Sequence, residues 1–150
     1  MCYFVAYKMT LPGKVYLMSS SLFLYKYPKG HQGRYIEDTA QKIAECFISE
    51  SILKDIDDLE PWTELRVFEE EGDDAYNNVT CVSNAKLGEL KRRIAELFVS
   101  SVRNVDATLD TTTGLDIPIT EIRTISNIHF LLRLKLEQFE TDDRVVIQLG

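Results

Sequence analysis

The sequence has few residues of the types that metal sites and catalytic centres use most. Among 150 residues there are two histidines, His31 and His129, and three cysteines, Cys2, Cys46 and Cys81. A structural zinc site needs such residues in closely spaced pairs, and these gaps are far too long. The chain also lacks the Gly-Lys-Ser/Thr ending of a phosphate-binding loop and the Gly-x-Ser-x-Gly turn of a serine hydrolase. We therefore assign no catalytic residue, no metal and no cofactor, and favour a protein that is not an enzyme.

Long apolar runs are also missing. No stretch reaches the roughly 18 apolar residues that a membrane helix needs, so we expect no membrane partner. The apolar segment at residues 1–6 has no basic residue before it and is followed closely by Lys8, which is unlike a secretory signal. Three unspaced cysteines, in a chain long enough to fold without disulfides, suit a reducing compartment. The expected location is the cytoplasm.

Positive charge is in short supply. The chain has 17 Lys and Arg residues against 24 Asp and Glu residues, which gives a formal net charge of −7. Nucleic-acid binding needs a basic stripe for the phosphates, and the concentrated basic triplet at residues 91–93 is flanked by Glu89 and Glu96. We therefore expect no nucleic-acid partner. An acidic surface steers basic molecules toward it, so the expected partner is a basic protein.

Apolar residues, by contrast, are abundant and regularly spaced. They make up 45% of the chain, and charged residues make up 27%, proportions that are typical of globular rather than disordered proteins. Alternation with period two predicts strands, and spacing near 3.6 predicts helices. Strands are predicted at residues 3–9, 15–27, 65–68, 79–82, 128–137 and 145–149, at most an edge strand at 115–119, and helices at 34–54 and 87–102. This order predicts a single α+β domain, with a mainly antiparallel sheet of about six strands and two amphipathic helices.

The clearest strand pattern is at residues 128–137. Leu132 and Leu134 alternate with polar residues that include His129 and Lys135, and Leu131 is the exception to the pattern. We therefore expect Leu134 to lie in the core and Lys135 to be solvated. His129, between basic neighbours on the polar face, is expected to be an ordinary surface histidine.

The loop at residues 29–34 is the best local candidate for a binding site. Its glycines would let backbone amides approach an anion, the helix predicted after it would offer free N–H groups, and two basic side chains would add charge. The alternative is a flexible connector in which the glycines only serve the turn. The candidate anion-binding residues are Lys29, Gly30, His31, Gly33 and Arg34.

An acidic run between the third and fourth predicted strands is the second candidate. It does not have the alternating ligand spacing of a calcium-binding loop, so it is either a solvated hairpin tip or a docking surface for a partner. The candidate partner-binding residues are Glu69, Glu70, Glu71, Asp73 and Asp74. Tyrosines near the N-terminus, which pack in the core or form an aromatic interaction surface, are Tyr3, Tyr7, Tyr16, Tyr25 and Tyr27.

Three hypotheses of function follow. The first is a small acidic regulatory protein without catalytic activity, comparable to an inhibitor or an antitoxin, that docks its acidic surface onto a basic protein. The second is a small-ligand binder or enzyme that uses the loop from Lys29 to Arg34 on an anionic group. The third is a structural subunit whose strand edges and tyrosines form a homo-oligomer.

Overall fold

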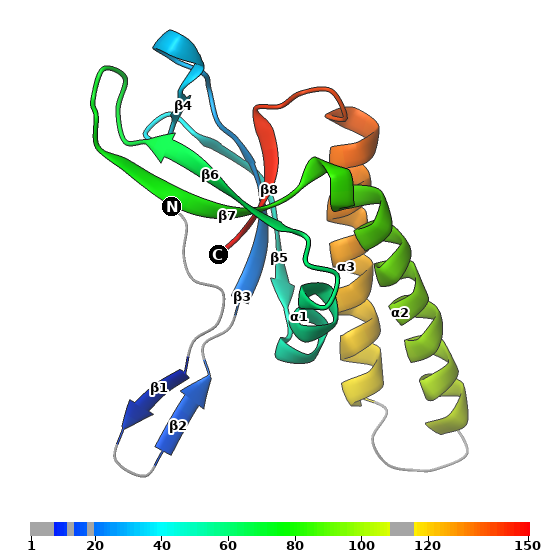
Figure 1. Ribbon diagram of the computed structural model, residues 1–150. Helices are drawn as coiled ribbons and strands as arrows, with labels where there is room; N and C mark the ends of the chain where they lie inside the picture. The colour runs from blue at the N-terminus through cyan, green and yellow to red at the C-terminus, as the bar shows by residue number, and fades with distance from the viewer. Residues whose placement is uncertain (1–7, 12–13, 18–19, 109–115) are drawn as a thin grey trace.

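The protein folds as an α+β unit (Figure 1). The computed structural model describes residues 8–11, 14–17, 20–108 and 116–150, and the side chains of residues 20–105 and 119–150. The strands are β1 (Lys8–Leu11), β2 (Lys14–Leu17), β3 (Ser20–Lys26), β4 (Tyr35–Ile36), β5 (Gln41–Ile48), β6 (Trp62–Phe68), β7 (Tyr76–Val82) and β8 (Val145–Leu149). The helices are α1 (Glu50–Asp57), α2 (Leu87–Thr108) and α3 (Asp116–Gln138), with short 3-10 turns at His31–Gly33 and Asn84–Lys86.

The main sheet has six strands in the order β4-β6-β7-β8-β3-β5. Its pairings are antiparallel except for the short parallel pair of β4 with β6, which confirms the predicted mainly antiparallel sheet. The predicted pairing of the third and fourth strands across the acidic run is also confirmed, as β6 and β7. β1 and β2 form a separate two-stranded sheet. The single return strand predicted at 15–27 is wrong, because its second half is β3, which pairs with β5 and β8 in the main sheet. Residues 1–7, 12–13 and 18–19 lie outside the described residues.

The two central strands β3 and β8 are apolar on both faces. In β8, Val145 and Ile147 belong to the core that the helices cover, while Val146 packs with the cluster on the opposite face. In β3, Leu24 belongs to the first cluster and Tyr25 to the second. Because side chains alternate across a strand, a strand with apolar residues in both registers is stable only where both faces are covered.

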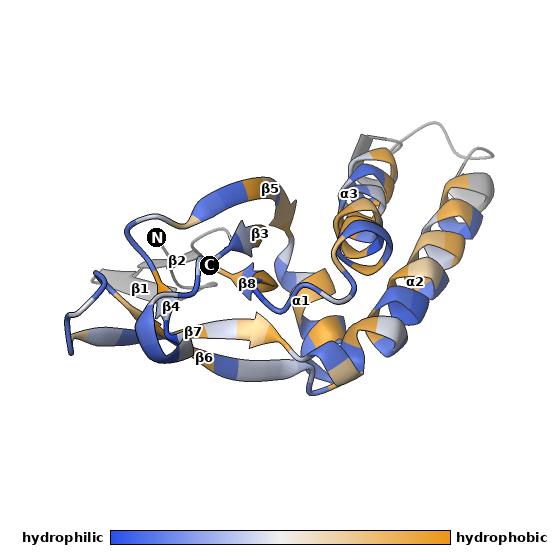
Figure 2. Cartoon of the chain, turned by 90° about the horizontal axis from the view of Figure 1, so that it is seen from above, coloured by the Kyte–Doolittle hydropathy of each residue, from blue (hydrophilic) through white to orange (hydrophobic). Residues whose placement is uncertain are grey.

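The three helices lie on one side of the sheet (Figure 2). α1 begins at Ser49, whose hydroxyl accepts a hydrogen bond from the Ile52 backbone N–H at 3.4 Å, an ordinary N-cap. α2 and α3 run side by side, and each contributes a buried stripe at helical spacing to the core. The stripes are Leu87, Leu90 and Ile94 on α2, and Ile125, Ile128 and Leu132 on α3. The helix predicted at 87–102 is therefore confirmed, but the structure has three helices where two were predicted.

The predicted strand at 128–137 is wrong, because these residues belong to α3. The exposure of Phe130 shows this most clearly. A strand would place Phe130 and Leu132 on the same face, yet Leu132 is fully buried and Phe130 is 60% exposed. Leu131, the exception to the alternation, is buried as helical spacing requires. The edge strand predicted at 115–119 is wrong as well, since α3 begins at Asp116 and places Pro118 in its first turn, where proline is tolerated.

The predicted helix at 34–54 is also wrong. β4, β5 and the first part of α1 occupy this range, and β5 pairs along its length with β3. The register shifts between Leu24 and Tyr25, whose partners are Ala44 and Lys42, so that Ile43 is an extra residue in β5. Such a bulge breaks the period of two. It makes a strand sequence resemble a helical pattern.

Lys135 is the largest departure from expectation in the core. It is 1% exposed, not solvated, while Leu134 is only half-buried. The Lys135 Nζ donates hydrogen bonds to the carbonyl oxygens of Phe139 at 2.8 Å and Asp142 at 3.0 Å. These carbonyls lie in the turn after α3, and they also accept hydrogen bonds from the backbone N–H groups of Asp142 and Val145. Burial lowers the pKa of Lys135.

We predict that Lys135→Met lowers the free energy of unfolding by about 1–3 kcal/mol, because it keeps the apolar stem but removes the two hydrogen bonds of the ammonium group. Arg133→Met on the same helix breaks an exposed pair with Glu137 and should cost less than about 0.5 kcal/mol. Urea denaturation of both variants measures the difference. Equal losses would show that the ammonium group contributes nothing to the helix end.

Asp142 gives the turn between α3 and β8 a defined pH response. Its carboxylate accepts hydrogen bonds from the Arg144 backbone N–H and guanidinium at 2.9–3.1 Å, and the guanidinium bond is the main reason that its pKa falls to about 2. A depressed pKa stabilises the fold above about pH 4, the range of an unfolded Asp, and that contribution is lost as the pH falls toward 2.

We therefore predict that the melting temperature of wild type falls more steeply between pH 4 and pH 2 than that of Asp142→Asn, which has no carboxylate to protonate. Thermal denaturation followed by circular dichroism at several pH values measures both slopes. Parallel curves would show that the pairing with Arg144 does not stabilise the folded state.

Candidate functional site

The fold brings together the two segments that the sequence singled out. The parallel pair of β4 and β6 places Ile36 opposite Phe68, so the loop before β4 lies beside the acidic tip after β6. The Glu71 Oε1 accepts a hydrogen bond from the His31 backbone N–H at 3.1 Å. The Arg34 Nη1 lies 3.3 Å from both the Asp74 carboxylate and the Asp73 carbonyl oxygen. Carboxylates of the tip thus already bind donors of the loop.

The loop itself differs from the expected anion site. The prediction that it opens a helix is wrong: it contains one 3-10 turn of three residues and continues into β4. Gly33 has φ +71°, which suits glycine, and a Cβ on Gly30 would lie 3.1 Å from Ile36 and 3.2 Å from the Glu71 Oε1. The glycines therefore serve the turn and its close approach to the tip.

Lys29 is engaged on the other side of the loop. Its ammonium forms an ion pair with the Asp143 carboxylate and lies 5.1 Å from the centre of the Tyr35 ring. The hydrogen bond to Asp143 is the main reason that the pKa of Lys29 is raised. The Tyr35 hydroxyl also donates to the Asp143 carbonyl oxygen at 3.3 Å. Both basic side chains of the loop, Lys29 and Arg34, are thus paired within the chain.

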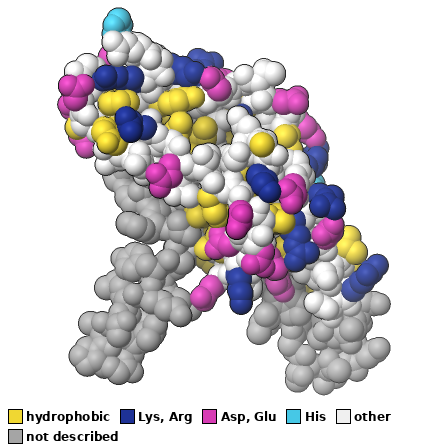
Figure 3. All heavy atoms as spheres, in the orientation of Figure 1, with side chains coloured by type: hydrophobic (Ala, Val, Ile, Leu, Met, Phe, Trp, Pro, Cys, Tyr) yellow, Lys and Arg dark blue, Asp and Glu magenta, His cyan; other side chains and the backbone are white. Residues whose placement is uncertain are grey.

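Folding enlarges the acidic surface. The backbone N–H groups of Glu37 and Asp38 donate to the carbonyl oxygens of Phe68 at 2.8 Å and Glu69 at 3.1 Å, which places two further carboxylates beside the tip. We call this surface the acidic end. Its members are Glu37, Asp38, Glu69, Glu70, Glu71, Asp73 and Asp74. Figure 3 shows acidic, basic and hydrophobic side chains interspersed at the end of the molecule where the β6–β7 hairpin lies.

A row of stacked side chains runs beside the acidic end. The Arg34 guanidinium lies 4.4 Å from the centre of the Phe68 ring, and Arg66 lies 4.3 Å from the centre of the Tyr76 ring. The two rings are 5.8 Å apart. Cation–π contacts at exposed sites contribute about 0.5–1 kcal/mol each. The row therefore fixes the base of the hairpin and leaves Tyr76 48% exposed.

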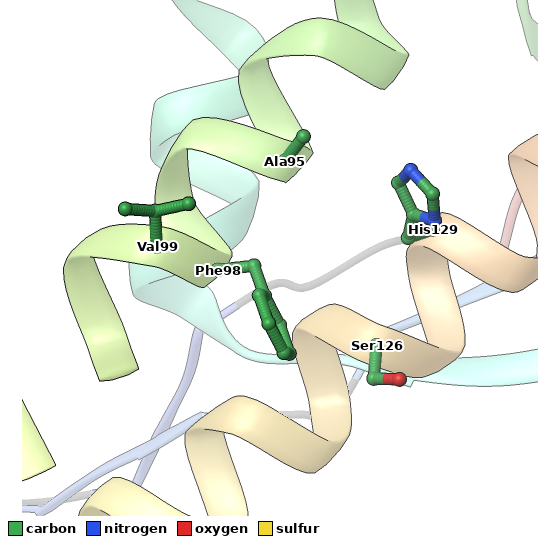
Figure 4. Close-up of a pocket in the computed structure, with 5 residues that line it drawn as sticks. All are labelled: Ala95, Phe98, Val99, Ser126 and His129. Atoms are coloured by element: carbon green, nitrogen blue, oxygen red, sulfur yellow. The ribbon is translucent and has the colours of Figure 1, made fainter. Parts of the chain in front are cut away.

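A second surface, which was not expected from the sequence, is a pocket of about 300 Å³ between α2 and α3. Figure 4 shows the side chains that line it, Ala95, Phe98 and Val99 from α2 and Ser126 and His129 from α3. Sequence reasoning missed this pocket because it placed residues 128–137 in a strand. The helical spacing of Ile125, Ile128 and Leu132 was the signal that could have revealed it.

His129, which was expected to be an ordinary surface histidine, is half-buried and lines this pocket. Its pKa is lowered, mainly by burial and further by the positive charges of Lys91 and Arg133, against which Glu137 acts. Ser126, three residues earlier on the same helix, also lines the pocket, and the described residues show no hydrogen bond between the two side chains.

The two described cysteines, Cys46 and Cys81, are buried and form no disulfide. Burial raises the pKa of Cys46 to about 12, which removes the thiolate that reactivity requires. Cys2 lies outside the described residues. Within the described part of the chain, no three His, Cys, Asp or Glu side chains gather as metal ligands. No described helix is both long and apolar enough to cross a bilayer.

Comparison with protein families, with curated proteins and with solved structures finds no match for this chain. The described part of the chain offers two candidate surfaces, the acidic end and the pocket between α2 and α3.

Proposed function

We propose that this chain is a protein-binding module without catalytic activity, which regulates or inhibits a basic partner protein by docking its acidic end. The supporting observation is the way in which folding concentrates carboxylates at one end of the sheet. Glu37 and Asp38 join the tip residues from more than thirty positions away, in contact through backbone hydrogen bonds to Phe68 and Glu69. The two basic side chains of the adjacent loop, Lys29 and Arg34, are already paired.

The acidic end divides into structural and available carboxylates. Glu71 and Asp74 bind the loop, and the Asp73 carboxylate accepts a hydrogen bond from the Ala75 backbone N–H at 3.1 Å. The side chains of Asp38, Glu69 and Glu70 are exposed and take part in no hydrogen bond or ion pair among the described residues. These three carboxylates are the ones that a basic partner would meet first.

Such carboxylates act mainly on the rate of encounter. Exposed charges steer association over a Debye length of about 8 Å at physiological salt, whereas dissociation depends on the buried contacts that form later. The row formed by Arg34, Phe68, Tyr76 and Arg66 gives the acidic end a rigid border. Its exposed ring, Tyr76, is of a type enriched in interfaces.

We predict that replacing Asp38, Glu69 and Glu70 by their amides slows association with the partner roughly tenfold or more at low salt, since electrostatic steering contributes factors of this size. The salt dependence should flatten, and the dissociation rate should change little. The partner is first recovered from the native source by affinity capture, and rates are then measured with the purified protein by surface plasmon resonance.

The matched control removes the same charge elsewhere, with Glu64→Gln, Glu121→Gln and Glu140→Gln. These side chains lie outside the acidic end and form no ion pair among the described residues. The control should associate nearly as fast as wild type. If both triple variants slow association equally, only the net charge matters, and docking through the acidic end is contradicted.

A further inference from the structure

The pocket between α2 and α3 belongs to a longer exposed apolar surface. Val99 and Val102 on α2 are 48% and 44% exposed, and Phe130 on α3 is 60% exposed. Val102 follows Phe98 by about one helical turn, and Phe130 follows Ser126 by one turn, so both extend the lining of the pocket along the helices. We call this surface the α2–α3 groove. Single exposed apolar residues are common, but contiguous ones mark interaction sites.

The size and lining of the groove fit one face of a helix better than a small molecule. A volume of about 300 Å³ is at the lower limit for ligand pockets, and Ser126 and His129 are the polar residues among those that line it. From Ala95 to Val102 the groove extends about 10 Å along α2. This length matches apolar anchors at positions i, i+3 and i+7 of a docked helix.

The charges around the groove comprise two ion pairs, Arg92 with Glu96 and Arg133 with Glu137, and two further basic side chains. Lys91 and Arg133 lie close enough to His129 to lower its pKa, and Arg123 is exposed three residues before Ser126 on α3. Arg133 pairs with Glu137, while Lys91 and Arg123 form no ion pair among the described residues. A chain with net charge −7 thus borders its apolar groove with basic side chains.

This border decides between the possible occupants. In a two-fold dimer through the groove, the same patch would face itself, and the basic borders of the two copies would meet with like charge, which is unfavourable. A membrane surface is flat, and it cannot fill a pocket whose lining lies between two helices. An acidic helix satisfies both the apolar lining and the basic border.

We propose that the α2–α3 groove binds an amphipathic helix of another protein, with apolar side chains filling the pocket and Asp or Glu residues facing Lys91 and Arg123. This interface is separate from the acidic end and takes a partner of the opposite charge. The chain would therefore join a basic protein at one surface and an acidic helix at the other.

The probe is a displayed library of helical peptides of about four turns, with apolar anchors at i, i+3 and i+7 and flanking positions randomised among Asp, Glu, Asn, Gln, Lys and Arg. Selection on the wild-type protein should enrich peptides with Asp and Glu. Their affinity, measured by fluorescence anisotropy, should fall by roughly tenfold or more in Val99→Glu, as for other central interface residues. The double variant Lys91→Glu and Arg123→Glu should shift the enrichment toward Lys and Arg.

Ser100→Glu is the matched control, because it adds the same charge at the next exposed position of α2, away from the residues that line the pocket. It should bind the selected peptides nearly as wild type does, and so should the amide variant of Asp38, Glu69 and Glu70, which keeps this test independent of the proposed function. Equal losses in Val99→Glu and Ser100→Glu would overturn the proposal, as would enrichment of neutral or basic peptides or of none.

Two further measurements test the other occupants. A concentration-dependent dimer in sedimentation velocity that Val99→Glu abolishes would assign the groove to a second copy of the chain. Binding to phosphatidylserine vesicles that depends on Val99, with no peptide enriched, would assign it to a membrane. Either result overturns the proposal, and a monomer that ignores vesicles and selects acidic peptides supports it.

Discussion

β8 is the last strand in the chain, yet it lies in the interior of the sheet, between β7 and β3. The β6–β7 hairpin and the β3–β5 pair are each antiparallel units, and in the described structure β8 joins them into one sheet. β8 is stable in this position because both of its faces are buried. Val145 and Ile147 pack in the helix-covered core. On the other face, Gln148 is fully buried and accepts a hydrogen bond from the Tyr27 hydroxyl. β8 therefore connects the half of the sheet beside the acidic end, β4-β6-β7, to the half formed by β3 and β5.

The sequence predicted those elements whose pattern fits only one structure. β6, β7 and α2 were found because their apolar residues follow a single period, and β8 was found from the alternation of Val145, Ile147 and Leu149. The apolar residues at 128–137 fit both the period of a strand and that of a helix. Packing against α2 and the sheet favours the helix, which buries Lys135. In β5, Ile43 is an extra residue only in relation to β3, the strand with which β5 pairs. Local sequence does not contain this information.

The candidate sites show the same limit. The glycines of the loop and the carboxylates of the acidic tip identified both segments as candidates. Their contact joins His31 to Glu71 across 40 residues, and no local sequence pattern predicts it. The contact also gives both segments a structural role. A carboxylate that accepts a hydrogen bond from a backbone amide stabilises the fold, whether or not it also contacts a partner. The groove could not be predicted at all without the helix that forms one of its walls.

The hydrogen bond between Tyr27 and Gln148 joins residues 121 positions apart, and it has a consequence for the order of folding. Contacts so distant in sequence pay the entropy of closing a long loop before they stabilise anything. Hairpins such as β6–β7 and helices such as α2 form on local contacts and therefore come early. Until β8 inserts, β3 and β7 each present an unpaired strand edge, the kind of surface on which chains pair with one another. The slow step of folding is thus also the moment of greatest risk of aggregation.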